Sequence, residues 1–253
     1  MSETLVAVPA HADDAELNAG GAMAKWAAAG GSIHIVMVTN NCSGSMIPPD
    51  GSEEAKRRLP PLETTAIRRR EQEAAAALLG AKVHYLDYCQ RHFWDGEKEI
   101  SEGYGDIPAP PGIAGHPPIL IACQQREHIE RLAKLLVELR PGLVLTQSVL
   151  DLDPEHHAVA AMVWHAFRRR EAELGNVPLR FWTPGSSCQD GLFDPGYGHI
   201  EDISEFHERK LELCRCHASQ MTQVRLDMVE RRAKLWGAGI GVRYAEPFKT
   251  ASR

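Results

Sequence analysis

Residues 4–17 read TLVAVPAHADDAEL, so that an apolar run passes through a short polar turn into an alanine-rich segment. The apolar run over residues 4–10 is typical of a buried strand. The segment 14–30 carries apolar residues at helical spacing, and residues 32–40 form a second buried strand pattern rich in β-branched residues. A strand, a helix and a second strand in this order indicate the start of a parallel sheet.

The same alternation continues along the chain. Strand patterns follow at residues 83–88, 143–145 and 179–183, and helical patterns at residues 63–79, 124–140, 157–173 and 204–235, the last as one long amphipathic helix. We therefore predict an α/β fold with a mainly parallel sheet and helices on both of its faces.

Two irregular segments interrupt this rhythm, at residues 89–118 and 184–197, and both are rich in glycine and proline. A loop as long as the first inside a compact domain is usually a functional lid or rim. Since the chain shows neither an internal repeat nor a linker, we predict that residues 1–253 form a single domain.

Composition excludes several classes of protein. Of the 253 residues, 43% are hydrophobic and 25% charged, as in an ordinary globular protein. The net charge of −6 argues against a nucleic-acid partner, which would require a basic surface. No apolar run approaches the roughly 18 residues of a membrane span, and the six cysteines lack metal-type Cys-x-x-Cys spacing. We expect a cytoplasmic protein with reduced thiols and no membrane partner.

Ligands in parallel sheets bind at the carboxyl ends of the strands, so the polar residues that follow each strand are the first candidates. His11, Asp13 and Asp14 follow the first strand, and a pair of histidines at residues 156–157 follows the strand at 143–145. A catalytic zinc usually has three nitrogen or oxygen ligands from the protein. His11, one aspartate and one of these histidines would complete such a set, and the other aspartate could accept a proton from water. Alternatively, the two aspartates only cap the following helix.

Five segments, in the same order along the chain, resemble the motifs of the LmbE-like, or PIG-L, N-deacetylases. The first is residues 11–17 with Gly20-Gly21, which is similar to the family's H-P-D-D-x-E signature. The others are RRRE at 68–71, in a helix pattern that ends in Leu79-Gly80 and is similar to the family's R-x-x-E helix, DPEH at 153–156, Lys210 with HASQ at 217–220, and YAEPF at 244–248.

This resemblance implies a Rossmann-like fold and one divalent ion, usually zinc, although His, Asp and His also suit iron and other divalent metals. It implies His11, Asp14 and His156 as metal ligands, with His157 as an alternative to His156, and Asp13 as the general base. Arg68 matches a substrate-contacting arginine. The implied reaction is hydrolysis of an N-acyl group, commonly N-acetyl, on a small amine such as an amino sugar. Relatives often assemble, which makes a homo-oligomer possible.

Two residues depart from the family pattern, and a third has two interpretations. Ala12 replaces the usual proline, and Asp153 replaces a histidine expected to bind the tetrahedral oxyanion. Asp153 followed by Pro154 is a good N-cap and first helical residue, but the carboxylate could also recognise substrate. His217 is either a core histidine or a substrate contact and proton donor at the site.

Two other functions remain open. One is an amidase of the same fold that acts on a larger N-acyl or thiol-conjugate substrate. The other is a metal- or ligand-binding protein without catalysis, a reading that Asp153 favours. Asp13 argues against it, because a protein that only binds has no need of a base beside three ligands.

Overall fold

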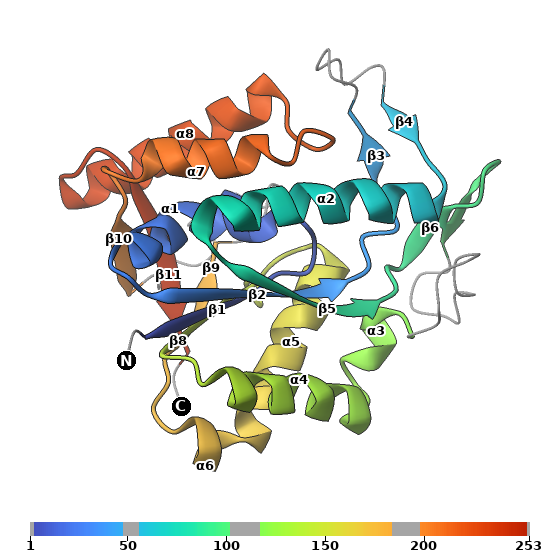
Figure 1. Cartoon of the computed structure of the whole chain (residues 1–253), viewed down its shortest axis with the longest axis horizontal. Coiled ribbons are helices and arrows are strands. Elements are labelled where there is room, and N and C mark those ends of the chain that lie inside the picture. Colours follow the sequence, from blue (N-terminus) through green and yellow to red (C-terminus); the bar gives the residue numbers. More distant parts are fainter. Residues whose placement is uncertain (1–2, 48–55, 102–116, 184–197, 252–253) are drawn as a thin grey trace.

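The computed structural model describes residues 3–47, 56–101, 117–183 and 198–251. A seven-stranded sheet in the order β10-β11-β9-β8-β1-β2-β5 lies at its centre (Figure 1). The strands are β1 (Thr4–Val8), β2 (Ser32–Thr39), β5 (Lys82–Tyr88), β8 (Leu143–Thr146), β9 (Leu179–Trp182), β10 (His199–Asp202) and β11 (Ala245–Thr250). The neighbouring pairs β9–β8, β8–β1, β1–β2 and β2–β5 are parallel. β11 is antiparallel to both of its neighbours, β10 and β9. The predicted mainly parallel sheet is confirmed.

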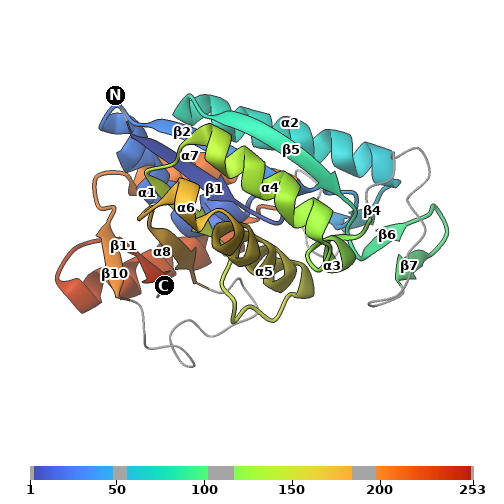
Figure 2. The same ribbon diagram turned by 90° about the horizontal axis from the view of Figure 1, so that it is seen from below.

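Helices cover both faces of the sheet (Figures 1 and 2). One layer consists of α1 (Asp14–Ala28), α2 (Pro61–Leu79), α7 (His207–Arg215) and α8 (Gln223–Ile240). The other consists of α3 (Ile119–Ala122), α4 (Arg126–Leu139), α5 (Pro154–Arg169) and α6 (Glu171–Leu174). Strand β1 contributes to both layers, since Leu5 and Ala7 belong to the core beneath α1, whereas Val6 and Val8 pack into the core beneath α4 and α5. Such burial on both faces explains the continuous apolar runs in the sequence.

The long helix predicted over residues 204–235 is wrong. It is two helices, α7 and α8, separated by a non-helical segment at residues 216–222. Tertiary contacts hold this segment: the Ser219 amide and hydroxyl both donate to the Glu71 carboxylate at 2.7 Å, and the Ser219 carbonyl accepts from the Ile47 amide. Thr222 then caps α8 by accepting from the Arg225 amide.

A buried ion pair on β11 and α7 is also hydrogen-bonded to α1. The Lys210 ammonium on α7 lies 2.7 Å from the Glu246 carboxylate on β11, and that carboxylate also accepts from the amides of Gly21 and Ala22 in α1. A side chain at Gly21 would meet Ile203 at 2.6 Å, so the glycine allows Ile203 to pack against α1 at this point. The three motif segments that contain Gly21, Lys210 and Glu246 thus contribute to the packing of the core.

Four further strands form two short antiparallel pairs beside the sheet. These pairs are β3 (Ser45–Met46) with β4 (Arg57–Arg58), and β6 (His92–Trp94) with β7 (Glu99–Ser101). The second pair belongs to the segment 89–118 for which a lid or rim was predicted; residues 102–116 of that segment and residues 184–197 lie outside the described residues.

Among the helices of the described ranges, none combines the length and the apolar character needed to cross a membrane.

The sheet order places the first strand at a topological switch point. β1 connects through α1 to β2 on one side, while β8 lies on its other side. The loops that leave β1 and β8 therefore diverge at their carboxyl ends, and such a crevice is where open α/β sheets bind ligands.

Candidate metal centre

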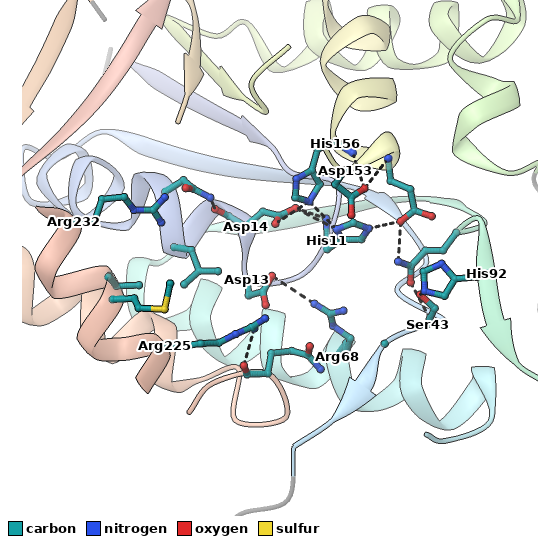
Figure 3. A pocket seen from close by; sticks show the side chains of 18 residues that line it. His11, Asp13, Asp14, Ser43, Arg68, His92, Asp153, His156, Arg225 and Arg232 are labelled. Atoms are coloured by element: carbon teal, nitrogen blue, oxygen red, sulfur yellow. Dashed lines mark hydrogen bonds and ion pairs between the residues drawn. The ribbon is translucent and has the colours of Figure 1, made fainter. Parts of the chain in front are cut away.

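Two loops bring the three predicted metal ligands together at this switch point. His11 follows β1, Asp14 begins α1, and His156 lies in the first turn of α5. One potential ligand atom from each of the three lies within 4.8 Å of the other two. His11 Nδ1 is 3.1 Å from His156 Nε2, and the Asp14 carboxylate oxygens lie 3.6 Å and 3.4 Å from these two nitrogens (Figure 3).

The second nitrogen of each imidazole faces a carboxylate. His11 Nε2 is 2.5 Å from Glu155 Oε2, and His156 Nδ1 is 2.9 Å from Asp151 Oδ2. A proton on each of these nitrogens satisfies the carboxylate and leaves a lone pair on His11 Nδ1 and on His156 Nε2. These lone pairs then face each other and the Asp14 carboxylate. Three electron-pair donors so close together are stabilised by a cation between them. The residues therefore fit a divalent metal with nitrogen and oxygen ligands.

The electrostatics of the cluster also favour a positive charge. Burial lowers the pKa of His11, but the hydrogen bond and charge of Glu155 outweigh it, so that the pKa lies above its ordinary value. His156 behaves alike, because Asp14 and Asp151 outweigh burial and raise its pKa well above the usual range. The two histidines in turn hold the pKa of Asp14 well below its usual range, against the effect of burial. A metal ion can supply the positive charge that protons supply otherwise.

Glu155 and Asp151 were not assigned a role from the sequence. Asp151 lies on the same loop as His156, and the carboxylate that commonly orients a metal-bound histidine could have been sought there. Glu155 could not be found in this way, because it pairs with His11 on a different loop. The Glu155 carboxylate is itself held by the Gln90 side chain at 3.0 Å and by the Arg91 amide.

Asp13 does not cap α1 through its side chain. Its backbone is left-handed, with a φ of 106°, and its carboxylate makes no capping hydrogen bond. Instead, Asp13 Oδ1 lies 3.5 Å from the Arg68 guanidinium, which also donates to the Ala12 carbonyl. Burial raises the pKa of Asp13, and the charge of Arg68 opposes this effect only in part. A carboxylate with a raised pKa, next to the candidate metal ligands, has the properties of a general base.

The structure places the other predicted site residues in different surroundings. Arg68 lines the same cavity as Asp13 and the three candidate ligands. His157 is exposed and is not part of the ligand cluster. His217 is fully buried behind Asp13, with Nε2 3.4 Å from Glu16 Oε2, and does not belong to the cavity wall. The structure thus places His217 in the core, which is one of its two predicted interpretations. A direct contact with substrate would require the side chain to reach the cavity, and it does not line it.

Asp153 occupies the N-cap of α5. One carboxylate oxygen accepts from the Glu155 amide at 2.8 Å and the His156 amide at 3.4 Å, and Pro154 is the first helical residue. The same side chain lines the cavity beside the candidate ligands. Because His156 lies in the turn that Asp153 caps, the cap also helps to position a candidate ligand.

Removal of this cap should be measurable. We expect Asp153→Ala to lower the free energy of unfolding by about 1 kcal/mol, since it leaves two amides of the first turn unsatisfied. Asp153→Asn should stay close to the wild-type value, because asparagine caps equally well. Chemical denaturation of the two variants is the measurement. Equal destabilisation by alanine and asparagine would contradict the capping role and would assign the ionised carboxylate another one.

The cavity has a volume of about 330 Å³, and the three candidate ligands line it. Ser43 and His92 lie at one end of it, and Arg225 and Arg232 on α8 at the other (Figure 3). Leu17, Met228 and Val229 add an apolar strip to the wall. Its size suits a small organic substrate.

Comparison with known proteins gives one family match. Residues 6–167 match the family model described as PIG-L: GlcNAc-PI de-N-acetylase. The match covers more than half of the chain and includes the three candidate ligands, Asp13 and Arg68. No curated protein sequence matches.

Several solved structures share the fold over nearly the whole chain. The 4-carboxy-2-hydroxymuconate hydratase GalB of Pseudomonas putida KT2440 has a TM-score of 0.70 at 20% identity, covering 99% of this chain and 97% of its own. The N,N'-diacetylchitobiose deacetylase of Pyrococcus horikoshii has a TM-score of 0.67 at 21% identity, covering 99% and 84%. A zinc-inhibited form of teicoplanin deacetylase has a TM-score of 0.66 at 18% identity, covering 98% and 99%.

Proposed function

Since the chain belongs to the PIG-L family of de-N-acetylases, we propose that it is a metal-dependent hydrolase that removes an N-acetyl or other N-acyl group from a small amine. The observation that carries this proposal is the position of Asp13, a buried carboxylate without a capping role, beside three converging ligand groups. An amino sugar or its glycoside is the proposed substrate class. The cavity, with a volume of about 330 Å³, has room for a molecule of this kind.

His11, Asp14 and His156 would hold the metal, and we propose zinc. A divalent ion supplies Lewis acidity, which polarises an amide carbonyl and makes water more acidic. Glu155 and Asp151 fix the two imidazole rings, and the Gln147 side chain donates to the Asp14 carboxylate at 2.6 Å. These contacts restrict the ligand side chains to one geometry before a metal arrives.

In this proposal, different residues carry out the proton transfers and the binding of substrate. Asp13 accepts a proton from water as the water attacks the carbonyl carbon, and it returns a proton to the nitrogen as the carbon–nitrogen bond breaks. Arg68 holds Asp13 in place and presents a guanidinium to substrate oxygens. Since the Asp153 carboxylate is held by two amides, it is poorly suited to donate a hydrogen bond to the oxyanion.

The direct test is release of a primary amine. We expect zinc-loaded protein to release amine from at least one member of a panel of N-acetylated sugars, N-acetylated polyamines and N-acylated thiol conjugates. Chelation should abolish the release, and added zinc should restore it. A panel in which only thiol conjugates or long-chain N-acyl substrates react would favour the amidase alternative. No amine from any member, by protein that holds one equivalent of metal, would contradict the proposal.

A second candidate is the addition of water to a carbon–carbon double bond, the type of reaction named for the Pseudomonas neighbour. The favouring observation is Asp153, which puts a carboxylate where amide hydrolysis by this family would use an imidazole. Loss of alkene absorbance without amine release would distinguish hydration from deacetylation.

A further inference from the structure

One wall of the cavity comes from a part of the chain outside the family match. Residues 225–232 of α8 present Arg225, Met228, Val229 and Arg232 to the cavity. Their spacing of three, four and seven residues puts them on one face of the helix, with an arginine at each end of an apolar centre. We call these four residues the α8 wall.

The acidic groups of the cavity have other partners. Asp14 faces the two histidines, Glu155 binds the His11 ring, and Asp13 is paired with Arg68. The Asp153 carboxylate accepts from two backbone amides of α5. Arg225 is held by neutral atoms: its guanidinium donates to the Gln220 carbonyl at 2.8 Å, and no ion pair joins it to another of the described residues. Arg232 donates to the Thr183 hydroxyl at 3.4 Å. The positive charge of Arg225 is therefore available to a ligand.

The position of Arg225 also indicates which part of a substrate it would meet. Arg225 and Asp13 line the same cavity, and Figure 3 shows Arg225 and Arg68 both beside Asp13. In the proposed reaction Asp13 returns a proton to the departing nitrogen. The amine portion of the substrate must then lie on the Asp13 side of the cavity, next to Arg225.

We propose that the α8 wall is a subsite for a carboxylate or phosphate group carried by the amine portion of the substrate, with Arg225 as its cationic residue. The subsite itself rests on the cavity geometry, and its assignment to the amine portion rests on the proposed function. Arginine binds both anions through two parallel hydrogen bonds, and the apolar strip of Met228 and Val229 suits the carbon skeleton between them.

Three sugars that differ only at position 6 test the proposal: N-acetylglucosamine, its 6-phosphate and its 6-carboxylate. We expect kcat/KM for amine release to be higher for an anionic sugar than for the neutral one. Arg225→Gln should reduce this anionic-to-neutral ratio about ten-fold, which corresponds to about 1.4 kcal/mol. The ratio cancels any effect of the change on Asp13. Arg225→Lys should retain part of the preference.

Arg231→Gln is the matched control, because Arg231 is the exposed neighbour of Arg232 and lies outside the cavity wall. It removes the same charge from the same helix and should leave the ratio unchanged. The phosphate and carboxylate arms distinguish the two anions. An unchanged ratio in Arg225→Gln, or an equal loss in Arg231→Gln, overturns the subsite. A preference for N-succinylglucosamine that depends on Arg225 overturns the assignment to the amine portion.

Binding keeps the test independent of catalysis. Calorimetry should show glucosamine 6-phosphate or the 6-carboxylate binding to the metal-loaded protein about ten-fold more tightly than to its Arg225→Gln variant. If these amines bind in this way but no substrate releases amine, the subsite stands and the proposed deacetylation fails. If amine is released but neither anion binds through Arg225, the deacetylation stands and the subsite fails.

Discussion

His11→Ala, Asp14→Ala and His156→Ala should each reduce bound metal to well below one equivalent, as measured by elemental analysis after desalting. Each change removes one of the three candidate ligands. It also leaves a partner behind in a buried site: Glu155 loses the His11 ring, and Asp151 loses the His156 ring. The loss of a ligand and the loss of a ring partner both weaken metal binding, because the remaining ligands are fewer and are less well oriented. Activity should disappear with the metal.

His157→Ala is the matched control for this prediction. His157 is the same residue type, adjacent in sequence and on the same helix, but it is exposed. It should keep its full metal content. A His157→Ala protein without metal, together with a His156→Ala protein that retains it, would reverse the assignment of the ligand. Circular dichroism of each variant separates loss of metal from loss of fold.

Asp13→Asn should separate metal binding from chemistry. Asparagine has nearly the same shape and can still contact Arg68, but it cannot accept a proton from water. Loss of a general base typically lowers the rate by about 10²- to 10⁴-fold. The metal content should stay near one equivalent, because Asp13 is not one of the three converging groups. Single-turnover measurement of amine release with metal-loaded protein gives the rate.

The unfolding midpoint of Asp13→Asn serves as its control. Since the Asp13 carboxylate makes no capping hydrogen bond with α1, stability should change little. A variant with near-normal turnover and full metal would remove Asp13 from the mechanism. A variant that loses its metal would instead show that Asp13 contributes to binding the ion.

Much of the fold followed from local patterns. Runs buried on both faces of a parallel sheet are apolar throughout, and helices with one buried stripe repeat at helical spacing, so the alternation along residues 4–40 predicted the sheet. The antiparallel edge at β10 and β11 was not predicted. Both strands, HIED and AEPFKT, mix charged with apolar residues and lack a continuous apolar run, and β11 packs against α1 and α8.

The split between α7 and α8 shows how tertiary contacts override a local pattern. Residues 204–235 have a helical periodicity, yet Ser219 is bound to Glu71 on α2 and to Ile47, and these bonds replace helical ones at that point. Such partners are far away in the sequence, so no local pattern records them. The interruption matters for function, because α8 starts anew at Thr222 and turns Arg225 toward the cavity.

The sequence by itself determined the types of candidate ligand and their loops: His11, Asp14 and His156 follow strands whose carboxyl ends meet at one edge of the sheet. The tertiary structure alone decided how each group is used. Asp13 and Asp14 are adjacent and chemically identical, but the left-handed backbone of Asp13 directs one carboxylate to Arg68 and the other to the histidines. Residue type and spacing follow from local chemistry, whereas the direction and partner of a side chain depend on packing between elements distant in sequence.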